Sequence, residues 1–403
     1  MKRMGFKELL FILPAIIIIA VFSLWPILKV INYSVFDYQL NNQQKSKLSL
    51  DEKFNVDLFN ENADYVIMFI DMNRFSFPED TQGKVDEVIN NVNEFKEILS
   101  GKSGFIELSG DLKGQVRASY NKLIEDVDFF INNFDFPDRE NLKLVMEDTK
   151  KCFVQSNFIG FAGYSNALKD ERMHDALWHT VVFTIISVAL ELVLGLGLAI
   201  IMNKAMKGQG IVRAVSLIPW AIPTTVAALM WSYLYDGSNG IVANILQNLH
   251  IISDSRDLLL SGGGAMASAI LADVWKTTPY MALLILAGFQ TIPGTVYESA
   301  KVDGSGVFNT FFKITLPLLK PSILVALLMR TLDAFRVFDL IYVLTGGGPG
   351  GSTETMSIYA YKTMFQQTNF GYGSVIVLLM VVCVAIIATF YIKILGANAM
   401  ERD

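Results

Sequence analysis

Four charged residues stand at regular spacing inside an apolar stretch near the C-terminal end of the sequence. They follow one another at intervals of three residues with alternating sign: Arg330, Asp333, Arg336 and Asp339. A helix would place them along one face, where opposite charges neutralise each other. A charge at the centre of a bilayer costs roughly 2.5–3.5 kcal/mol on insertion scales, so it needs a partner or a water-filled cavity.

Two interpretations of this charged row stay open. It can simply help a helix cross the bilayer, or contact a neighbouring helix. Alternatively, part of it lines a polar pathway together with Phe335 and Tyr342. Trp231 and Tyr280 raise the same question, because aromatic rings at the ends of apolar stretches are typical of membrane interfaces. Aromatic faces can also stack on the apolar faces of sugar rings.

No catalytic or metal-binding pattern emerges from the sequence. There is no Ser/His/Asp set, and neither the histidines nor the cysteines have metal-ligand spacing. Gly101-Lys102-Ser103 is similar to the end of a phosphate-binding loop, but Lys96 occupies the position of the required first glycine. We therefore expect this chain to bind no cofactor and no metal. If it takes part in an ATP-driven activity, ATP and magnesium must be held by another polypeptide.

The composition indicates a membrane protein with a separate acidic part. Hydrophobic residues make up 52% of the 403 residues, and the mean hydropathy is +0.40. Residues 38–175 contain 25 Asp and Glu against 16 Lys and Arg, whereas the remainder contains 14 against 17. A solvated face outside the membrane explains this acidic block better than a site for cationic ligands.

Six apolar runs are long enough to cross a bilayer core of about 30 Å. The predicted spans are 9–30, 177–202, 211–235, 266–289, 322–344 and 373–395. The first contains Pro14 and Pro26 and has no cleavage site, so it is expected to be an uncleaved span rather than a signal peptide. The fold class predicted is all-α and polytopic.

Basic residues give the predicted orientation. Eleven of them fall on one side: Lys2, Arg3, Lys7, Lys204, Lys207, Arg213, Lys301, Lys313, Lys320, Lys393 and Arg402. The short loops 236–264 and 345–370 on the other side contain only Arg256 and Lys362. The positive-inside rule then predicts that both termini are cytoplasmic and that residues 38–175 are extracytoplasmic.

Between the first two spans lies an insertion with its own periodicity. Apolar residues recur at helical spacing in 85–99 and 116–134, and 142–153 is a third helical candidate. Residues 66–70 have the composition of a strand. We expect a mainly helical domain over 38–156, after a first span in 1–37 and before a core in 157–403.

Residues 291–321 are predicted to form a protruding knob. Thr295 and Glu298 have capping-box spacing for a short helix that ends at Asp303-Gly304, where glycine permits positive φ. Ser305 can cap a second short helix that Pro317 and Pro321 end. Two short helices at an angle suit a partner's groove, although Glu298 can instead serve only as a cap.

The knob resembles the EAA loop of ABC-importer permeases. The matching positions are Glu298, Ser299, Ala300, Asp303, Gly304, Ile314, Leu316 and Pro317, with Ser299 replacing the usual alanine. Residues 157–184, 213–223 and 338–349 are similar to the core of sugar-type permeases of the MalF-like branch. In that family the loop couples to a separate ATPase subunit.

The resemblance implies the six-helix type I ABC-importer fold and a multi-pass protein of a bacterial or archaeal cell membrane. It also implies partners: a second, MalG-like permease subunit, two ABC ATPase subunits and an extracytoplasmic solute-binding protein. By position alone, the insertion 38–156 is similar to a loop that contacts the solute-binding protein. The implied function is inward transport of a carbohydrate, an oligosaccharide, by ATP-driven alternating access. Nothing implies nucleic-acid binding.

Three alternatives stay open at this point. An ion-coupled secondary transporter could use the charged row as a relay. A membrane-anchored sensor could bind a ligand through the acidic domain, although six spans are more than a sensor needs. Within the ABC class, a polyol phosphate could replace the sugar.

Overall fold

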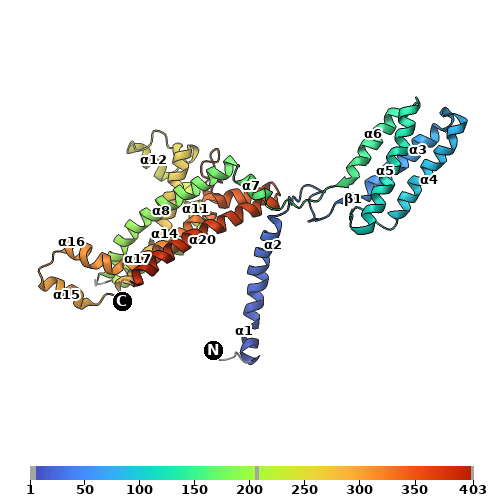
Figure 1. Cartoon of the computed structure of the whole chain (residues 1–403). Coiled ribbons are helices and arrows are strands. Elements are labelled where there is room, and N and C mark those ends of the chain that lie inside the picture. The colour runs from blue at the N-terminus through green and yellow to red at the C-terminus, as the bar shows by residue number, and fades with distance from the viewer. Residues whose placement is uncertain (1–5, 205–207, 401–403) are drawn as a thin grey trace. The chain divides into compact units, whose positions relative to one another are not determined.

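The computed structural model describes residues 6–204 and 208–400, with side chains over 13–204 and 208–394 (Figure 1). Four of the eleven basic residues used for the orientation lie outside these residues: Lys2, Arg3, Lys207 and Arg402. The chain divides into two compact units. One, the insertion unit, is residues 35–160, and the other, the membrane unit, is residues 1–34 with 161–403.

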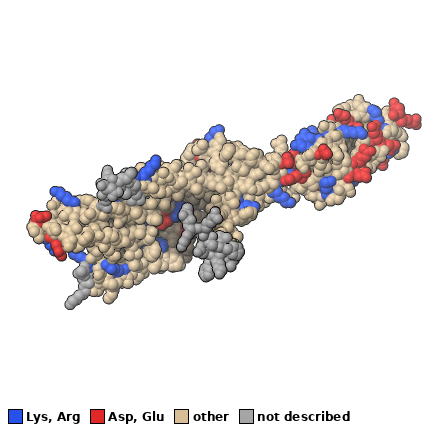
Figure 2. Space-filling model, turned by 60° about the horizontal axis from the view of Figure 1, so that its bottom comes forward, with Lys and Arg blue, Asp and Glu red and all other residues tan. Residues whose placement is uncertain are grey.

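The insertion unit consists of four helices and a small sheet. The helices are α3 (Val56–Met72), α4 (Gln82–Ile98), α5 (Gly110–Asn133) and α6 (Arg139–Thr149). The strands are β1 (Lys53–Asn55), β2 (Phe105–Glu107) and β3 (Phe153–Val154), in the order β2-β1-β3 and antiparallel. Asp and Glu side chains cover much of the face of this unit shown in Figure 2.

Apolar faces of the four helices close around one aromatic core in the insertion unit. Phe54, Phe59 and Phe95 are fully buried, and the rings of Phe59 and Phe95 have centroids 4.1 Å apart. The helical prediction for 85–99 and 116–134 agrees with α4 and α5. The strand prediction for 66–70 is wrong, because Val66 and Ile70 lie one turn apart on the buried face of α3.

Truncating this core will unfold the insertion unit. Phe95→Ala removes a buried ring and should cost about 3–5 kcal/mol of stability. Limited proteolysis of the full chain should then cut within residues 35–160 at much lower protease concentration than in wild type. Phe75→Ala is the matched control, since Phe75 is 90% exposed. Equal cleavage of both variants would contradict this account of the core.

The membrane unit contains five described helices that are long and apolar enough to cross a membrane. They are residues Leu13–Tyr33, Glu171–Asn203 (α8), Gly262–Phe289 (α14), Val307–Phe335 and Phe370–Ile394 within α20 (Phe370–Met400). The first comprises the second half of α1 (Phe6–Ile19), a π-helical turn at Ala20–Leu24, and α2 (Trp25–Tyr33). These five correspond to five of the six predicted spans.

The span predicted at 211–235 is not one continuous helix. It is divided into α9 (Gln209–Ser216), α10 (Ile218–Ala221) and α11 (Thr224–Leu234). Ile222 is extended, with ψ 133°, because the residue before a proline avoids the helical region. Pro223 therefore ends one segment and precedes the next, a break that hydropathy alone does not predict.

The span predicted at 322–344 is also not one continuous helix. Its first part is α17 (Leu316–Phe335), and α18 (Asp339–Leu344) follows after a break at 336–338. Pro317 and Pro321 do not end a helix. Instead α16 (Val307–Thr310) continues through the π-helical turn Phe311–Thr315 into α17 as one helix. Pro317 directly follows the π-helical turn, whose altered hydrogen bonding accommodates the missing N–H inside the continuous helix.

Small residues allow the three central helices to approach closely. A Cβ atom on Gly195 of α8 would lie 2.8 Å from Met281 Cγ of α14, and one on Gly288 of α14 would collide with Ser322 of α17. Such contacts are typical of helix packing in lipid. Accordingly, α14 packs against both α8 and α17, and α11 packs against α18. The face of this body seen in Figure 2 has few charged side chains.

Candidate functional site

A buried charge cluster joins the three central helices. Arg330 of α17 donates from Nη2 to Glu191 Oε1 of α8 at 2.7 Å and to Asp273 Oδ2 of α14 at 2.9 Å. The side chains of Arg330, Glu191 and Asp273 are 4%, 0% and 9% exposed. Thr277 donates a further hydrogen bond to Glu191 at 2.7 Å. Every charge in the cluster is therefore paired, as burial among apolar helices requires.

Lys276 extends this cluster to the broken helix. Its Nζ donates to the backbone carbonyls of Ile222 at 2.7 Å and Trp220 at 3.3 Å. The last carbonyls of a helix have no partner within it, and here they belong to the end of α10. Asp273 and Lys276 are one turn apart on α14. Asp273 pairs with Arg330, and Lys276 binds the break before Pro223, so α14 links the break directly to the charge cluster.

The prediction that the four alternating charges lie along one continuous helical face is wrong. Only Arg330 is buried, and its partners come from other helices rather than from its own. Asp333 and Arg336 form an exposed pair at 2.9 Å, where α17 ends. Asp339 is exposed in the first turn of α18. The break at 336–338 turns the chain away from the direction that a single helix would have kept.

The aromatic candidates lie in separate stacks. Tyr280 stacks on Trp220 with ring centroids 5.6 Å apart and planes at 12°. Trp231 stacks on Tyr235 at 5.0 Å, and neither the indole N–H nor the Tyr235 hydroxyl has a hydrogen-bond partner among the described residues.

Tyr342 and Phe335 pack against different cores, and Tyr342 shares its core with Trp231. Tyr342 packs on Phe338 at 5.1 Å, and Phe335 is buried in a different cluster with Met356 and Ile376. The structure therefore does not bring the predicted pathway residues into one site.

The knob is formed by α15 (Gly294–Val302) and α16, which protrude together at one end of the helical body (Figure 1). Gly304 has φ +71°, Ser305 N–H donates to Ala300 O at 2.9 Å, and Gly304 N–H donates to Lys301 O at 3.1 Å. This is a Schellman motif, and it ends α15 where the sequence predicted. Neither predicted cap forms: the N-cap residues are Pro293 and Gly306.

The predicted coupling residues differ in exposure. Glu298, Ser299 and Asp303 are exposed together on one side of α15, around a shallow depression. Ala300 is buried beneath them. Ile314 and Leu316 are half-buried and Pro317 is exposed, all in the helix that leads into α17. The acidic face of α15 is thus open to a partner.

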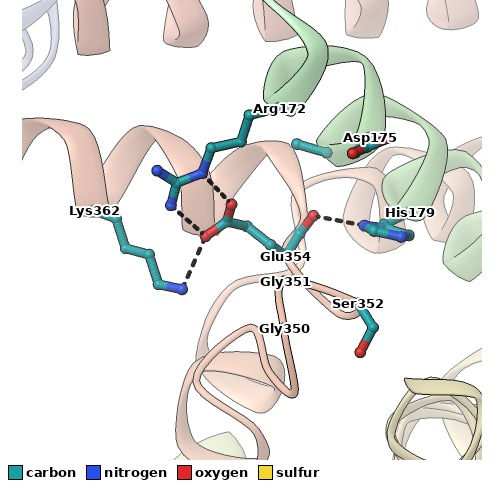
Figure 3. Close-up of a pocket in the computed structure, with 9 residues that line it drawn as sticks. Arg172, Asp175, His179, Gly350, Gly351, Ser352, Glu354 and Lys362 are labelled. Carbon is teal, nitrogen blue, oxygen red and sulfur yellow. Dashed lines mark hydrogen bonds and ion pairs between the residues drawn. The ribbon is translucent and has the colours of Figure 1, made fainter. Parts of the chain in front are cut away.

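A polar pocket of about 540 Å³ lies elsewhere in the membrane unit, between α8 and the loop before α19 (Met356–Tyr361) (Figure 3). Glu354 accepts from Arg172 Nε at 2.7 Å and from Lys362 Nζ at 2.8 Å. Burial raises the pKa of Glu354, but the bonds from the two cations outweigh it, so the pKa lies below its ordinary value. His179 Nδ1 approaches the Glu354 carbonyl at 3.3 Å. The carboxylate therefore ties α8 to this loop.

The sequence did not predict two of these contacts. One is the contact of Lys276 with the carbonyls of the broken helix, and the other is the pairing of Glu354 with Arg172 and Lys362. Arg172 and Glu354 are 182 residues apart, and no local spacing links them. Pro219 and Pro223 were the available signal for the break that Lys276 occupies. Glu191 is different, because a lone carboxylate in an apolar span predicts a hydrogen bond between helices, and the bonds to Arg330 and Thr277 confirm it.

Long apolar helices, a paired buried charge cluster and a protruding knob define a polytopic membrane transport subunit. Residues 191–399 match the family described as binding-protein-dependent transport system inner membrane component, and the chain belongs to that family. The matched region begins at Glu191 and includes the charge cluster and the knob.

Similar proteins carry sugar-transport names. The chain is 44% identical over 237 residues to the trehalose/maltose transport system permease protein MalF of Thermococcus litoralis, covering 59% of this chain and 79% of the relative. It is 43% identical over 242 residues to the trehalose transport system permease protein SugA of Mycobacterium tuberculosis, covering 60% and 76%. These relatives confirm the predicted MalF-like resemblance.

Solved structures agree on the fold. A chain of a bacterial alginate ABC transporter, crystallised with an alginate pentasaccharide-bound periplasmic protein, superposes with a TM-score of 0.53 at 23% identity. The match covers 70% of this chain and 94% of the other. The predicted type I ABC-importer permease fold is thereby confirmed, with the third span interrupted.

Removing the cation of the cluster should destabilise the membrane unit. Arg330→Met leaves Glu191 and Asp273 as unpaired buried carboxylates, a loss of about 3–5 kcal/mol. The melting temperature of the purified chain in detergent should fall steeply. Arg336→Met, which removes an exposed cation from the same segment, should change it little. Adding Glu191→Gln and Asp273→Asn to Arg330→Met should restore stability, and no recovery would argue against charge pairing as the cause.

Proposed function

We propose that this chain is the permease subunit of a binding-protein-dependent ABC importer that carries a carbohydrate, specifically an oligosaccharide, into the cell. The observation that carries the proposal is the 44% identity to a permease named for trehalose and maltose transport, over 79% of its length. Family membership favours this function over an ion-coupled secondary transporter and over a sensor. The sugar names of the relatives favour it over a polyol-phosphate permease.

The proposed complex contains a second, MalG-like permease subunit, two ABC ATPase subunits that hold ATP and magnesium, and an extracytoplasmic solute-binding protein. In this arrangement both termini and the knob face the cytoplasm, and the insertion faces the other side. The distribution of basic residues supports this orientation. The insertion unit is then available to the solute-binding protein.

The proposed mechanism is alternating access. Closure of the ATPase dimer moves the knob, which contacts the ATPase through Glu298, Ser299 and Asp303. Because the helix from Val307 runs without interruption to Phe335, this motion reaches the packing of α17 against α8 and α14. Trp231 and Tyr342 pack against the same hydrophobic core, and we propose that these two residues, with Tyr280 from a separate stack, come to line the sugar pathway that this motion opens and closes.

Transport should require ATP and a sugar-loaded binding protein. In proteoliposomes that contain the complete complex, trehalose or maltose delivered by the binding protein should stimulate ATP hydrolysis and accumulate inside. Glycerol 3-phosphate should do neither. Uptake that continues without ATP but stops when an ionophore dissipates the ion gradient would overturn the proposal in favour of a secondary transporter.

The turn of the knob supplies a specific test of coupling. Gly304→Pro is incompatible with φ +71° and removes the N–H bonded to Lys301 O, so the Schellman motif cannot form. Membrane insertion should be normal, while sugar-stimulated ATP hydrolysis and uptake should be lost. Gly294→Pro is the matched control, because a proline is tolerated at the first position of α15. Unchanged uptake by Gly304→Pro would refute the coupling role.

A further inference from the structure

A cavity of about 750 Å³ lies beneath the knob, on the side of α15 away from its acidic face. Its walls come from the C-terminal ends of α8 and α14, from α15, and from the start of the helix at Val307. Ile200, Phe289, Val307 and Phe311 are among its apolar lining residues. This cavity is separate from the charge cluster and from the pocket of Glu354.

Among the described residues, the two charged ones that line the cavity are both cations. Lys204 follows the last turn of α8, and Lys301 lies in α15. Both are exposed, and neither forms an ion pair with any of the described residues. No acidic side chain lines the cavity among the described residues. An anion would therefore gain two attractive contacts there without meeting a carboxylate.

Basic and acidic side chains lie on opposite sides of α15. Tyr297 and Lys301, one turn apart, face the cavity. Glu298 and Asp303 line the depression on the other side of the same helix. A partner that contacts the acidic face leaves the basic face free, so the two sides serve different ligands.

The position of the cavity indicates an amphipathic anion. The long apolar helices α8 and α14 end beside the cavity, at Asn203 and Phe289, and lipid headgroups lie toward the ends of helices that cross a bilayer. Lys side chains at this level interact favourably with anionic headgroups. The apolar walls beside the lysines would accept the glycerol and the first methylenes of an acyl chain, which a free inorganic anion would leave unfilled.

We propose that this cavity binds the headgroup of an anionic phospholipid. Lys204 and Lys301 contact its phosphate oxygens, Tyr297 donates a hydrogen bond, and the acyl chains leave along Ile200 and Phe311. A bound lipid would brace the knob against the ends of α8 and α14, so the lipid would influence how motion of the knob is passed on. This inference rests on the membrane location of the chain and not on the sugar that it carries.

Lipid retention by the purified full chain tests the proposal. Native mass spectrometry in detergent, with phosphatidylglycerol and phosphatidylcholine added in turn, should show preferential retention of phosphatidylglycerol by wild type. Lys204→Gln with Lys301→Gln should reduce that preference roughly 30-fold, since each lysine near the surface contributes about a factor of five. Lys313→Gln with Lys320→Gln is the matched control, because both lysines are exposed on the same segment and neither lines the cavity.

Each outcome decides the proposal. Equal retention of the two lipids by wild type, or an equal loss of preference in the control pair, overturns it. Glycerol 3-phosphate that binds as tightly as the lipid also overturns it, because the site would then take a soluble phosphate ester. Lys204→Arg with Lys301→Arg should keep the preference, which separates loss of charge from loss of fold. The assay needs no ATPase partner and no sugar, so its failure leaves the proposed import function unaffected.

Discussion

The membrane unit depends on the requirement that every charge buried among apolar helices find a partner. Arg330 meets this requirement by joining Glu191 and Asp273, and in doing so it fixes the relative positions of α8, α14 and α17. Lys276 meets it by binding carbonyls that the break before Pro223 leaves free. This cluster adds a polar constraint to the close packing of the same helices at Gly195 and Gly288.

Much of the architecture could be predicted because it follows from local signals. Hydropathy and length located five long helices, and the Asp303-Gly304 pair correctly ended α15 since positive φ is a local property of glycine. The same local reasoning failed where distant contacts decide. Val66–Ile70 has strand-like composition, but its helix is stabilised by packing against the rest of the insertion core.

The candidate site was less predictable than the fold for the same reason. Regular spacing of four charges indicated a helical face, yet the helix ends at Phe335, and Arg330 pairs with residues 139 and 57 positions away. The effect of proline was predicted wrongly at two places in the sequence. Pro317 and Pro321 are accommodated within a helix, where a π-helical turn directly precedes Pro317, while Pro223 divides a helix and Lys276 takes the carbonyls that this break frees.

In the proposed coupling, the continuous helix from Val307 to Phe335, which includes the π-helical turn Phe311–Thr315, would act as a lever with the knob at one end and the charge cluster near the other. At 1.5 Å per residue, Arg330 lies about 35 Å from Val307 along its axis. A tilt of about 5° at one end would displace the other by about 3 Å, comparable with the length of a hydrogen bond. In the proposed coupling, a small angular change at the knob would therefore be comparable in size with the contacts that hold the ion pairs of Arg330.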